Sequence, residues 1–325
     1  MPSPAIDARH PRWPTQARAA AGVAYVATGP VYVQEAREAA ARLKRHNPRV
    51  PICLITDQPA EPAFWDELVL IANPAFGFRD KILMGLCPFE RFLFLDTDTT
   101  PLADISDLFQ LLERFDLAGH QLFEGHDCPV PGIPDAFPEF NSGVLGFRRS
   151  PALNDFFARW LVNYDHFYAL NREGNYDYSN ASDQKSFRQT VYESDLRVAI
   201  LGPEYNFVPH HLNFACAPVR ILHTRGWRHL EEMARRLNAR LGNRVYVPRL
   251  DVVLTNDPAA PELRRLWWMA TLQLLRHAAV GLTPSGLRGW LRHRPLIRRL
   301  FLRNRFLEPA SETDYKWHRS SSAEK

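Results

Sequence analysis

Cysteine is scarce in this chain of 325 residues, which has four copies and no C-x-x-C spacing. A zinc site or a disulfide framework is therefore not expected, and we expect reduced thiols. No uninterrupted apolar run reaches the roughly 18 residues that a membrane span needs. The first 20 residues also lack the apolar core of a signal peptide. These absences predict a cytoplasmic protein.

Positive charge is concentrated near the C-terminus. Residues 261–307 contain ten arginines, one glutamate and neither lysine nor aspartate, whereas the formal net charge of the whole chain is only +4. Trp, Leu and Phe alternate with these arginines, which is typical of basic helices that lie on an anionic membrane surface. The alternative is that these helices pack on the rest of the protein and expose arginine to water. No pattern of a nucleic-acid module accompanies them, so no nucleic-acid partner is expected.

Strand and helix patterns alternate through the first two thirds of the chain. Short β-branched and aromatic runs at 22–28, 50–56 and 68–71 are separated by a helical period at 33–43. This order predicts an α/β fold with a mixed, mostly parallel sheet flanked by helices. We expect a flexible segment at 1–20, a main domain at 21–230, a helical basic extension at 231–310 and a flexible tail at 311–325.

One stretch carries the strongest chemical signal. Four apolar residues, Phe92 to Leu95, precede Asp96 and Asp98. They predict a buried strand whose carboxyl end, where ligands bind in open α/β sheets, bears two carboxylates. In an extended chain the two side chains would point the same way and could hold Mg2+ or Mn2+. The alternative is a pair of turn-forming aspartates.

The same stretch also fits the hhhhDxDx[TV] pattern of haloacid-dehalogenase-like phosphatases, in which Asp96 would be the nucleophile. Such enzymes need a later acidic pair, often Gly-Asp-x-x-x-Asp, to complete their metal site. No Gly-Asp dipeptide follows Asp98 in this chain. The phosphatase is therefore the weaker hypothesis.

Further blocks occur in an order that resembles another family. They are Lys81, Phe94 to Asp98, Asn141 to Val144, Asp183-Gln184, Tyr205-Asn206 and Ile221 to His223. Over residues 22–226 this order is similar to the GT-A (Rossmann-like) glycosyltransferases, above all to family 8 and related nucleotide-diphospho-sugar transferases.

The resemblance implies a role for each block. A divalent metal, Mn2+ or Mg2+, would be held by Asp96, Asp98 and His223. The donor would be bound by Thr28, Asp57, Arg79, Lys81, Ser142, Gly143 and Arg225. The residues beside the transferring sugar would be Asn141, Asp183 and Gln184. Turns, a strand and helix starts would also explain several of these residues without any function.

One block departs from the family pattern. Family 8 members usually follow the histidine with Gly-x-x-Lys-Pro-Trp, whereas this chain continues from His223 as Thr-Arg-Gly-Trp-Arg. Arg225 or Arg228 would then have to take the place of the lysine at the diphosphate.

The resemblance implies a metal-dependent hexosyltransferase. It would move a sugar from a nucleoside-diphosphate sugar, with UDP-sugar the expected donor, to a glycan or lipid-linked acceptor, with retention at the anomeric carbon. The basic segment would place it as a peripheral protein on the cytoplasmic face of a membrane. A protein of a different class, a catalytically silent membrane-associated binding module, would explain the same blocks.

Overall fold

The computed structural model of the chain describes residues 5–61, 64–122, 130–172, 182–224, 230–239, 242–248, 251–255, 268 and 271. The chain divides into two units, Met1–Val245 and Tyr246–Lys325. The first unit includes α6 (Leu230–Asn238).

The strands and helices of the first unit follow the predicted alternation. In chain order they are β1 (Ile6–Asp7), β2 (Ala19–Ala27), α1 (Pro30–His46), β3 (Ile52–Thr56), β4 (Glu67–Ala72), α2 (Phe78–Lys81), the 3-10 helix η2 (Ile82–Leu86), β5 (Phe89–Leu95), β6 (Thr99–Pro101), α3 (Ser106–Leu111), β7 (Leu117–Gln121), β8 (Phe140–Arg148), α4 (Pro151–Arg172), α5 (Gln184–Tyr192), β9 (Val198–Leu201), η3 (Pro203–Tyr205), β10 (Asn213–Ala215), β11 (Ile221–His223) and α6. β12 (Arg244–Val247) spans the division, and β13 (Val252–Thr255) lies in the second unit.

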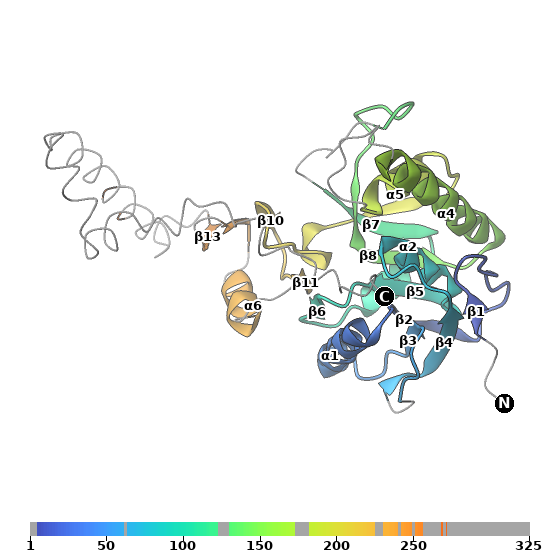
Figure 1. Ribbon diagram of the computed structural model, residues 1–325. Helices are drawn as coiled ribbons and strands as arrows, with labels where there is room; N and C mark the ends of the chain where they lie inside the picture. Colours follow the sequence, from blue (N-terminus) through green and yellow to red (C-terminus); the bar gives the residue numbers. More distant parts are fainter. Residues whose placement is uncertain are drawn as a thin grey trace, which may run out of the picture. The chain divides into compact units, whose positions relative to one another are not determined.

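A mixed sheet forms the centre of the first unit, with the strand order β1-β4-β3-β2-β5-β8-β7-β9 (Figure 1). Pairing is parallel from β1 through β5, antiparallel on both sides of β8, and parallel again between β7 and β9. β11 pairs antiparallel with β6 just beyond the carboxyl end of β5. The expected mostly parallel sheet is therefore confirmed, and its central strand is the one that leads to Asp96.

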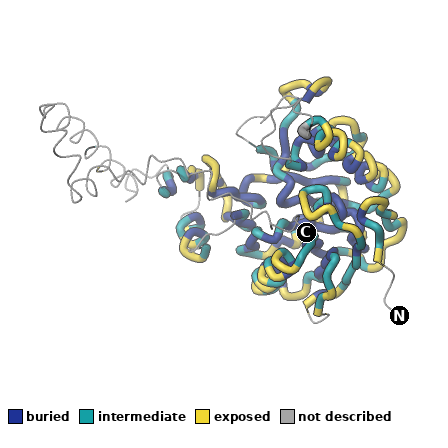
Figure 2. Tube along the Cα trace, viewed as in Figure 1, coloured by how far each residue is buried: buried dark blue, intermediate teal, exposed yellow. Residues whose placement is uncertain are grey.

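Helices cover both faces of this sheet, and β5 shows why. Its Leu93 and Leu95 pack in one apolar cluster with α1 and α3, whereas Phe92 and Phe94 pack in a second cluster with η2, α4 and α5. Successive side chains of a strand point to opposite faces, so a run of four apolar residues serves two cores. The strands are accordingly buried between helices whose outer sides are exposed (Figure 2).

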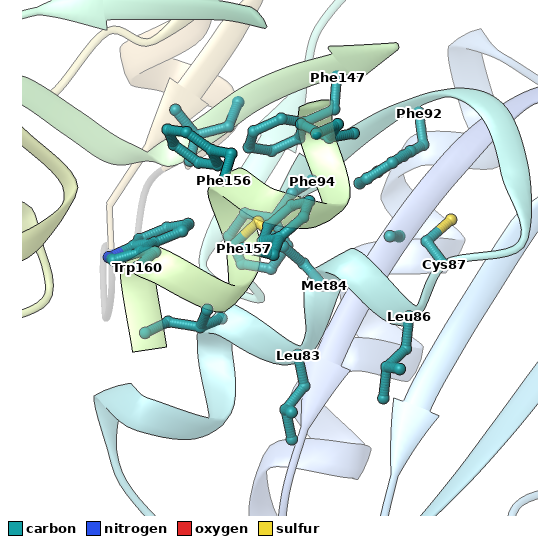
Figure 3. Close-up of a cluster of buried hydrophobic side chains, with 14 of the residues drawn as sticks. Leu83, Met84, Leu86, Cys87, Phe92, Phe94, Phe147, Phe156, Phe157 and Trp160 are labelled. Atoms are coloured by element: carbon teal, nitrogen blue, oxygen red, sulfur yellow. The ribbon is translucent and has the colours of Figure 1, made fainter. Parts of the chain in front are cut away.

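An aromatic cluster fixes α4 against η2 and the sheet (Figure 3). The Phe147 ring centroid lies 5.2 Å from that of Phe92 and 5.1 Å from that of Phe157. Trp160, at 0% exposure, donates from Nε1 to Ser186 Oγ of α5 at 3.1 Å. Large buried rings such as these contribute several kcal/mol each, and they hold the start of α5 in place.

The N-terminal segment differs from the flexible arm that the sequence predicted for residues 1–20. β1 pairs with β4, Ala8 is buried, and the Trp13 ring packs 5.4 Å from the ring of Phe157. Arg149 donates to the carbonyl of Pro14 at 3.0 Å. These few apolar residues find partners on the sheet and on α4, which is why the described part of the segment, from residue 5 onward, is packed.

Several expectations fall outside the described residues. The basic segment 261–307 is one of them, apart from residues 268 and 271, and the tail at 311–325 is another. Among the residues that the structure does describe, no helix has both the length and the apolar character to cross a membrane. The described cysteines, Cys53, Cys87 and Cys216, are free thiols, as expected.

Asp116 joins β7 to its neighbours through two arginines. Its carboxylate accepts hydrogen bonds from Arg197 Nε at 3.0 Å and from Arg148. The hydrogen bond from Arg197 is the main reason that the pKa of Asp116 is lowered to about 2. A carboxyl group with a lowered pKa stabilises the fold above its unfolded pKa, and this contribution is lost as the pH falls through the folded value.

We therefore expect Asp116→Asn to reduce the free energy of unfolding by about 1 kcal/mol at pH 7. The difference from the unmodified protein should shrink between pH 4 and about pH 2. Urea unfolding at several pH values measures it. Asp155→Asn, at an exposed position of α4, is the control that should change nothing, and a pH-independent loss would contradict the ionic explanation.

Candidate functional site

Asp96 and Asp98 lie in the tight turn that connects β5 to β6. The Thr99 backbone N–H and its hydroxyl both donate to the carbonyl of Asp96, at 3.0 and 2.7 Å. Thr97 Oγ1 donates to Glu35 Oε2 of α1 at 2.6 Å. The sequence suggested that the two carboxylates lie on an extended strand and point the same way. Instead, both belong to a turn. The turn orients them, because it closes directly after Leu95.

His223 is brought to this turn by β11. It lies opposite Thr99 in the β6–β11 pairing, and the next residue, Thr224, donates from its backbone to the carbonyl of Asp98 at 3.1 Å. His223 Nε2 lies 3.3 Å from Asp98 Oδ1 and 3.7 Å from Asp96 Oδ2. The three residues that the resemblance named as metal ligands are thus neighbours, although Asp98 and His223 are 125 positions apart in the sequence.

This cluster fits a divalent cation. One ligand atom from each of Asp96, Asp98 and His223 can be chosen so that all lie within 4.8 Å of one another. Neighbouring ligands of an octahedral ion at about 2.1 Å from the metal are about 3 Å apart, which is close to the two distances above. Two carboxylates and one imidazole suit Mn2+ well and Mg2+ less well, because Mg2+ prefers oxygen ligands.

Gly143 of β8 shapes the space beside the cluster. Its carbonyl accepts the backbone N–H of Asp96 at 2.9 Å, so β8 lies directly against the turn. A Cβ at Gly143 would be only 2.0 Å from His223 Cε1 and 2.6 Å from Nδ1. The glycine is required there because the imidazole ring occupies the position that a side chain would take.

Lys81, at the end of α2, connects the carboxylates. Its ammonium donates to Asp96 Oδ2 at 2.8 Å and to Ser142 Oγ at 3.0 Å, and it lies 3.8 Å from Asp183 Oδ2. Burial acts to lower the pKa of Lys81, but the charges of Asp183 and Asp96 outweigh it, so this pKa is raised. Burial also raises the pKa of Asp96, against the opposing effect of Lys81.

Asp183 and Gln184 stand at the start of α5. Asp183 is 1% exposed, and among the described residues its Oδ2 has no hydrogen-bond partner. A buried carboxylate oxygen without a donor is costly, and a ligand hydroxyl would satisfy it. The Gln184 backbone N–H bonds to Ser182 Oγ at 3.3 Å, which sets the beginning of the helix next to Asp183.

Asn141 is linked to His223 through a residue that the sequence analysis did not include in the site. Asn141 Oδ1 accepts from the Gly143 N–H and from Asn206 Nδ2, both at 2.9 Å. Asn206 Oδ1 in turn lies 2.9 Å from His223 Nδ1. The signal for Asn206 was its place in the ordered blocks, as part of Tyr205-Asn206, but no chemistry had been assigned to it.

Thr28 and Asp57 follow the neighbouring strands β2 and β3. Asp57 Oδ1 accepts the backbone N–H of Gly29 at 2.8 Å, and Thr28 Oγ1 donates to Asp80 Oδ2 at 3.1 Å. Asp80 directly precedes Lys81, so the hydrogen bond from Thr28 connects the end of β2 to the turn that carries the lysine. Thr28 and Asp57 lie on the side of the sheet where ligands bind in this type of fold.

Arg79 is not brought to the cluster. Its guanidinium forms a two-point contact with Asp165 of α4, at 2.8 and 3.1 Å, and also donates to the carbonyl of Ala8 at 2.9 Å. This geometry uses the donors of Arg79 to tie α2 to α4 and to the N-terminal segment. Arg225 and Arg228 lie outside the described residues.

The comparisons with known proteins add solved structures only. No family model matches the chain, and no curated protein does. The glycosyltransferase GlyE of Streptococcus pneumoniae TIGR4 is similar at 18% identity and a TM-score of 0.46, over 67% of this chain and 61% of that one. This chain thus spans less than two thirds of GlyE.

Two further structures are similar over nearly their whole length. The galactosyltransferase LgtC, solved with donor and acceptor sugar analogues, has 15% identity and a TM-score of 0.48, over 68% of this chain and 96% of that one. Mouse xyloside xylosyltransferase 1 has 13% identity and a TM-score of 0.41, over 63% and 97%.

The close approach of Gly143 to His223 gives a direct test of the cluster. Gly143→Ala should displace the imidazole and weaken Mn2+ binding by about 10-fold or more, as other changes to the support of a metal ligand do. Titration with Mn2+, followed by electron paramagnetic resonance, measures this. Gly77→Ala is the matched control, because a Cβ there meets nothing within 4 Å. Equal affinities of both variants would remove His223 from the metal site.

Proposed function

We propose that this chain is a metal-dependent glycosyltransferase. It moves a hexose from a nucleoside-diphosphate sugar, with a UDP-sugar as the expected donor, to a glycan or lipid-linked acceptor, with retention at the anomeric carbon. The observation that carries the proposal is the meeting of Asp96, Asp98, His223 and Lys81 at the carboxyl end of β5.

The charges of this cluster suit a diphosphate leaving group. Negative charge develops on the diphosphate as the bond to the anomeric carbon breaks, and it must be offset by nearby cations. Asp96, Asp98 and His223 would hold Mn2+ or Mg2+, which supplies part of that positive charge when bound. Lys81 adds a second cation, fixed by Asp96 and Ser142.

The remaining residues fit the donor sugar and the nucleotide. The buried Oδ2 of Asp183 would accept a hydrogen bond from a sugar hydroxyl. Gln184, at the start of α5, and Asn141, in β8, are assigned as the amides that would contact the donor sugar. At Gly143 the missing side chain leaves room for the imidazole of His223, so this residue would serve the donor by positioning a metal ligand. Thr28 and Asp57 are assigned to the nucleotide side of the donor, at the ends of β2 and β3.

The two alternatives are less well supported. A haloacid-dehalogenase-like phosphatase needs a second acidic pair beside Asp96, whereas among the described residues the group that could hold a metal completes its set with His223. A silent binding module would not need Asp183 to keep a carboxylate oxygen buried without a donor in the described part of the chain.

Hydrolysis of a panel of sugar nucleotides, with and without Mn2+, tests the proposal. We expect Mn2+-stimulated release of the nucleoside diphosphate. Asp96→Asn and Asp98→Asn should each reduce it by about 100-fold or more, since each removes a charged metal ligand. Asp155→Asn on α4 is the control, and circular dichroism checks the fold. Turnover of p-nitrophenyl phosphate with none of the sugar nucleotides would instead support the phosphatase, and no turnover at all the silent module.

We further propose that residues 261–307 dock the protein on the cytoplasmic face of a membrane, where a lipid-linked acceptor would be found. The support is the composition of this segment, with ten arginines interspersed with Trp, Leu and Phe.

Deletion of residues 261–325 should release the protein from liposomes that contain anionic lipid, while leaving hydrolysis of the sugar nucleotide in solution. Flotation measures the first and the nucleotide assay the second. The full chain on liposomes of neutral lipid alone is the control for charge. Retention of the truncated protein on anionic liposomes would refute the docking role.

A further inference from the structure

Asn206 lies between Asn141 and His223 and is completely buried, at 0% exposure. It follows η3, and the next residue, Phe207, exchanges backbone hydrogen bonds with β11. Its N–H donates to the carbonyl of Ile221 at 3.0 Å, and its carbonyl accepts the N–H of His223 at 2.9 Å. The backbone thus fixes Asn206 beside the imidazole before any side-chain contact is considered.

The direction of the hydrogen bonds is set at Gly143. Its backbone N–H can only donate, so the atom of Asn141 that lies 2.9 Å away must be the oxygen Oδ1. The atom of Asn206 that faces this same oxygen at 2.9 Å must then be a donor, the nitrogen Nδ2. Each amide orientation follows from the one before it, beginning from a backbone group that cannot be reversed.

The series of hydrogen bonds ends at His223. With Nδ2 of Asn206 directed at Asn141, its Oδ1 faces His223 Nδ1 at 2.9 Å, and a carbonyl oxygen can only accept. The imidazole must therefore carry a proton on Nδ1. In the neutral ring the lone pair is then on Nε2, the atom directed at Asp98 Oδ1 and Asp96 Oδ2.

We infer that Asn141 and Asn206 form an amide relay that holds His223 in its metal-binding tautomer, so that Asn206 is a positioning residue of the cation site. In the opposite tautomer Nε2–H would donate to Asp98 and no lone pair would face a cation. The inference rests on the proposed function, because the orientation of this lone pair matters only where a metal is bound. Loss of such supporting contacts typically weakens metal binding by about 10 to 100-fold.

Asn206→Leu removes both amide functions while keeping the branching at Cγ and the number of side-chain heavy atoms. Asn213→Leu is the matched control: Asn213 is also buried, at 6% exposure, but it bonds through Oδ1 to the neighbouring N–H of Phe214 in β10. Two readouts on the full chain are needed, the protonation of His223 in the metal-free protein and the Kd for Mn2+ alone.

The tautomer is measured by long-range 1H-15N correlation on 15N-histidine protein at pH 8. The His223 signals are assigned by their loss in His223→Gln. We expect a proton on Nδ1 alone in the unmodified protein and in Asn213→Leu, and on Nε2 in Asn206→Leu. A proton on Nε2 in the unmodified protein, alone or together with Nδ1, would overturn the inference.

The Kd for Mn2+ should rise by about 10 to 100-fold in Asn206→Leu and by less than about 2-fold in Asn213→Leu. An unchanged Kd in Asn206→Leu would also overturn the inference. If the unmodified protein bound no Mn2+, the proposed metal-dependent function would fail by itself. The tautomer measurement would still decide the relay, since it is made without metal.

Discussion

The site depends on an excess of carboxylates over ammonium groups in a largely buried part of the protein. Asp96, Asp98 and Asp183 bring three carboxylates together, and Lys81 is the ammonium that contacts two of them. At their formal charges, three carboxylates and one ammonium leave two negative charges, which is the charge that a divalent cation would balance. Burying unbalanced carboxylates costs several kcal/mol per ion. A bound cation would remove this cost, which explains why the carboxylates are placed together.

The position of Lys81 is a consequence of packing far from the charges. α2 is a single short turn that leads directly into η2. The buried Leu83, Met84 and Leu86 of η2 belong to the same apolar cluster as the rings of α4, and Met84 lies beside Phe157 (Figure 3). Arg79 ties the same turn to α4 through Asp165. Arg79, which was expected at the phosphates, thus helps to position α2 and with it Lys81. Lys81 in turn donates to the carboxylate of Asp96.

Much of the fold could be predicted from local patterns, because β5 has two apolar residues for each face and α1 and α4 have clear apolar sides. The three residues of the cluster, Asp96, Asp98 and His223, could also be named, but only through the order of the blocks. The turn that orients the two aspartates could not be predicted, because the same residues are compatible with a strand that ends at Leu95 and with one that ends at Asp98. Nor could the role of Arg79 be predicted, since it is decided by Asp165, 86 residues away.

β8 connects the carboxylates to the histidine through its backbone. At Gly143 the carbonyl fixes the Asp96 turn and the N–H fixes Asn141, so a single residue anchors both sides of the cluster at 2.9 Å each. Its missing side chain leaves the space that the imidazole fills. Ligand position and tautomer are therefore set by the sheet itself, and a backbone N–H cannot rotate or flip as an amide can. A site built this way is arranged to accept a cation before the cation is present.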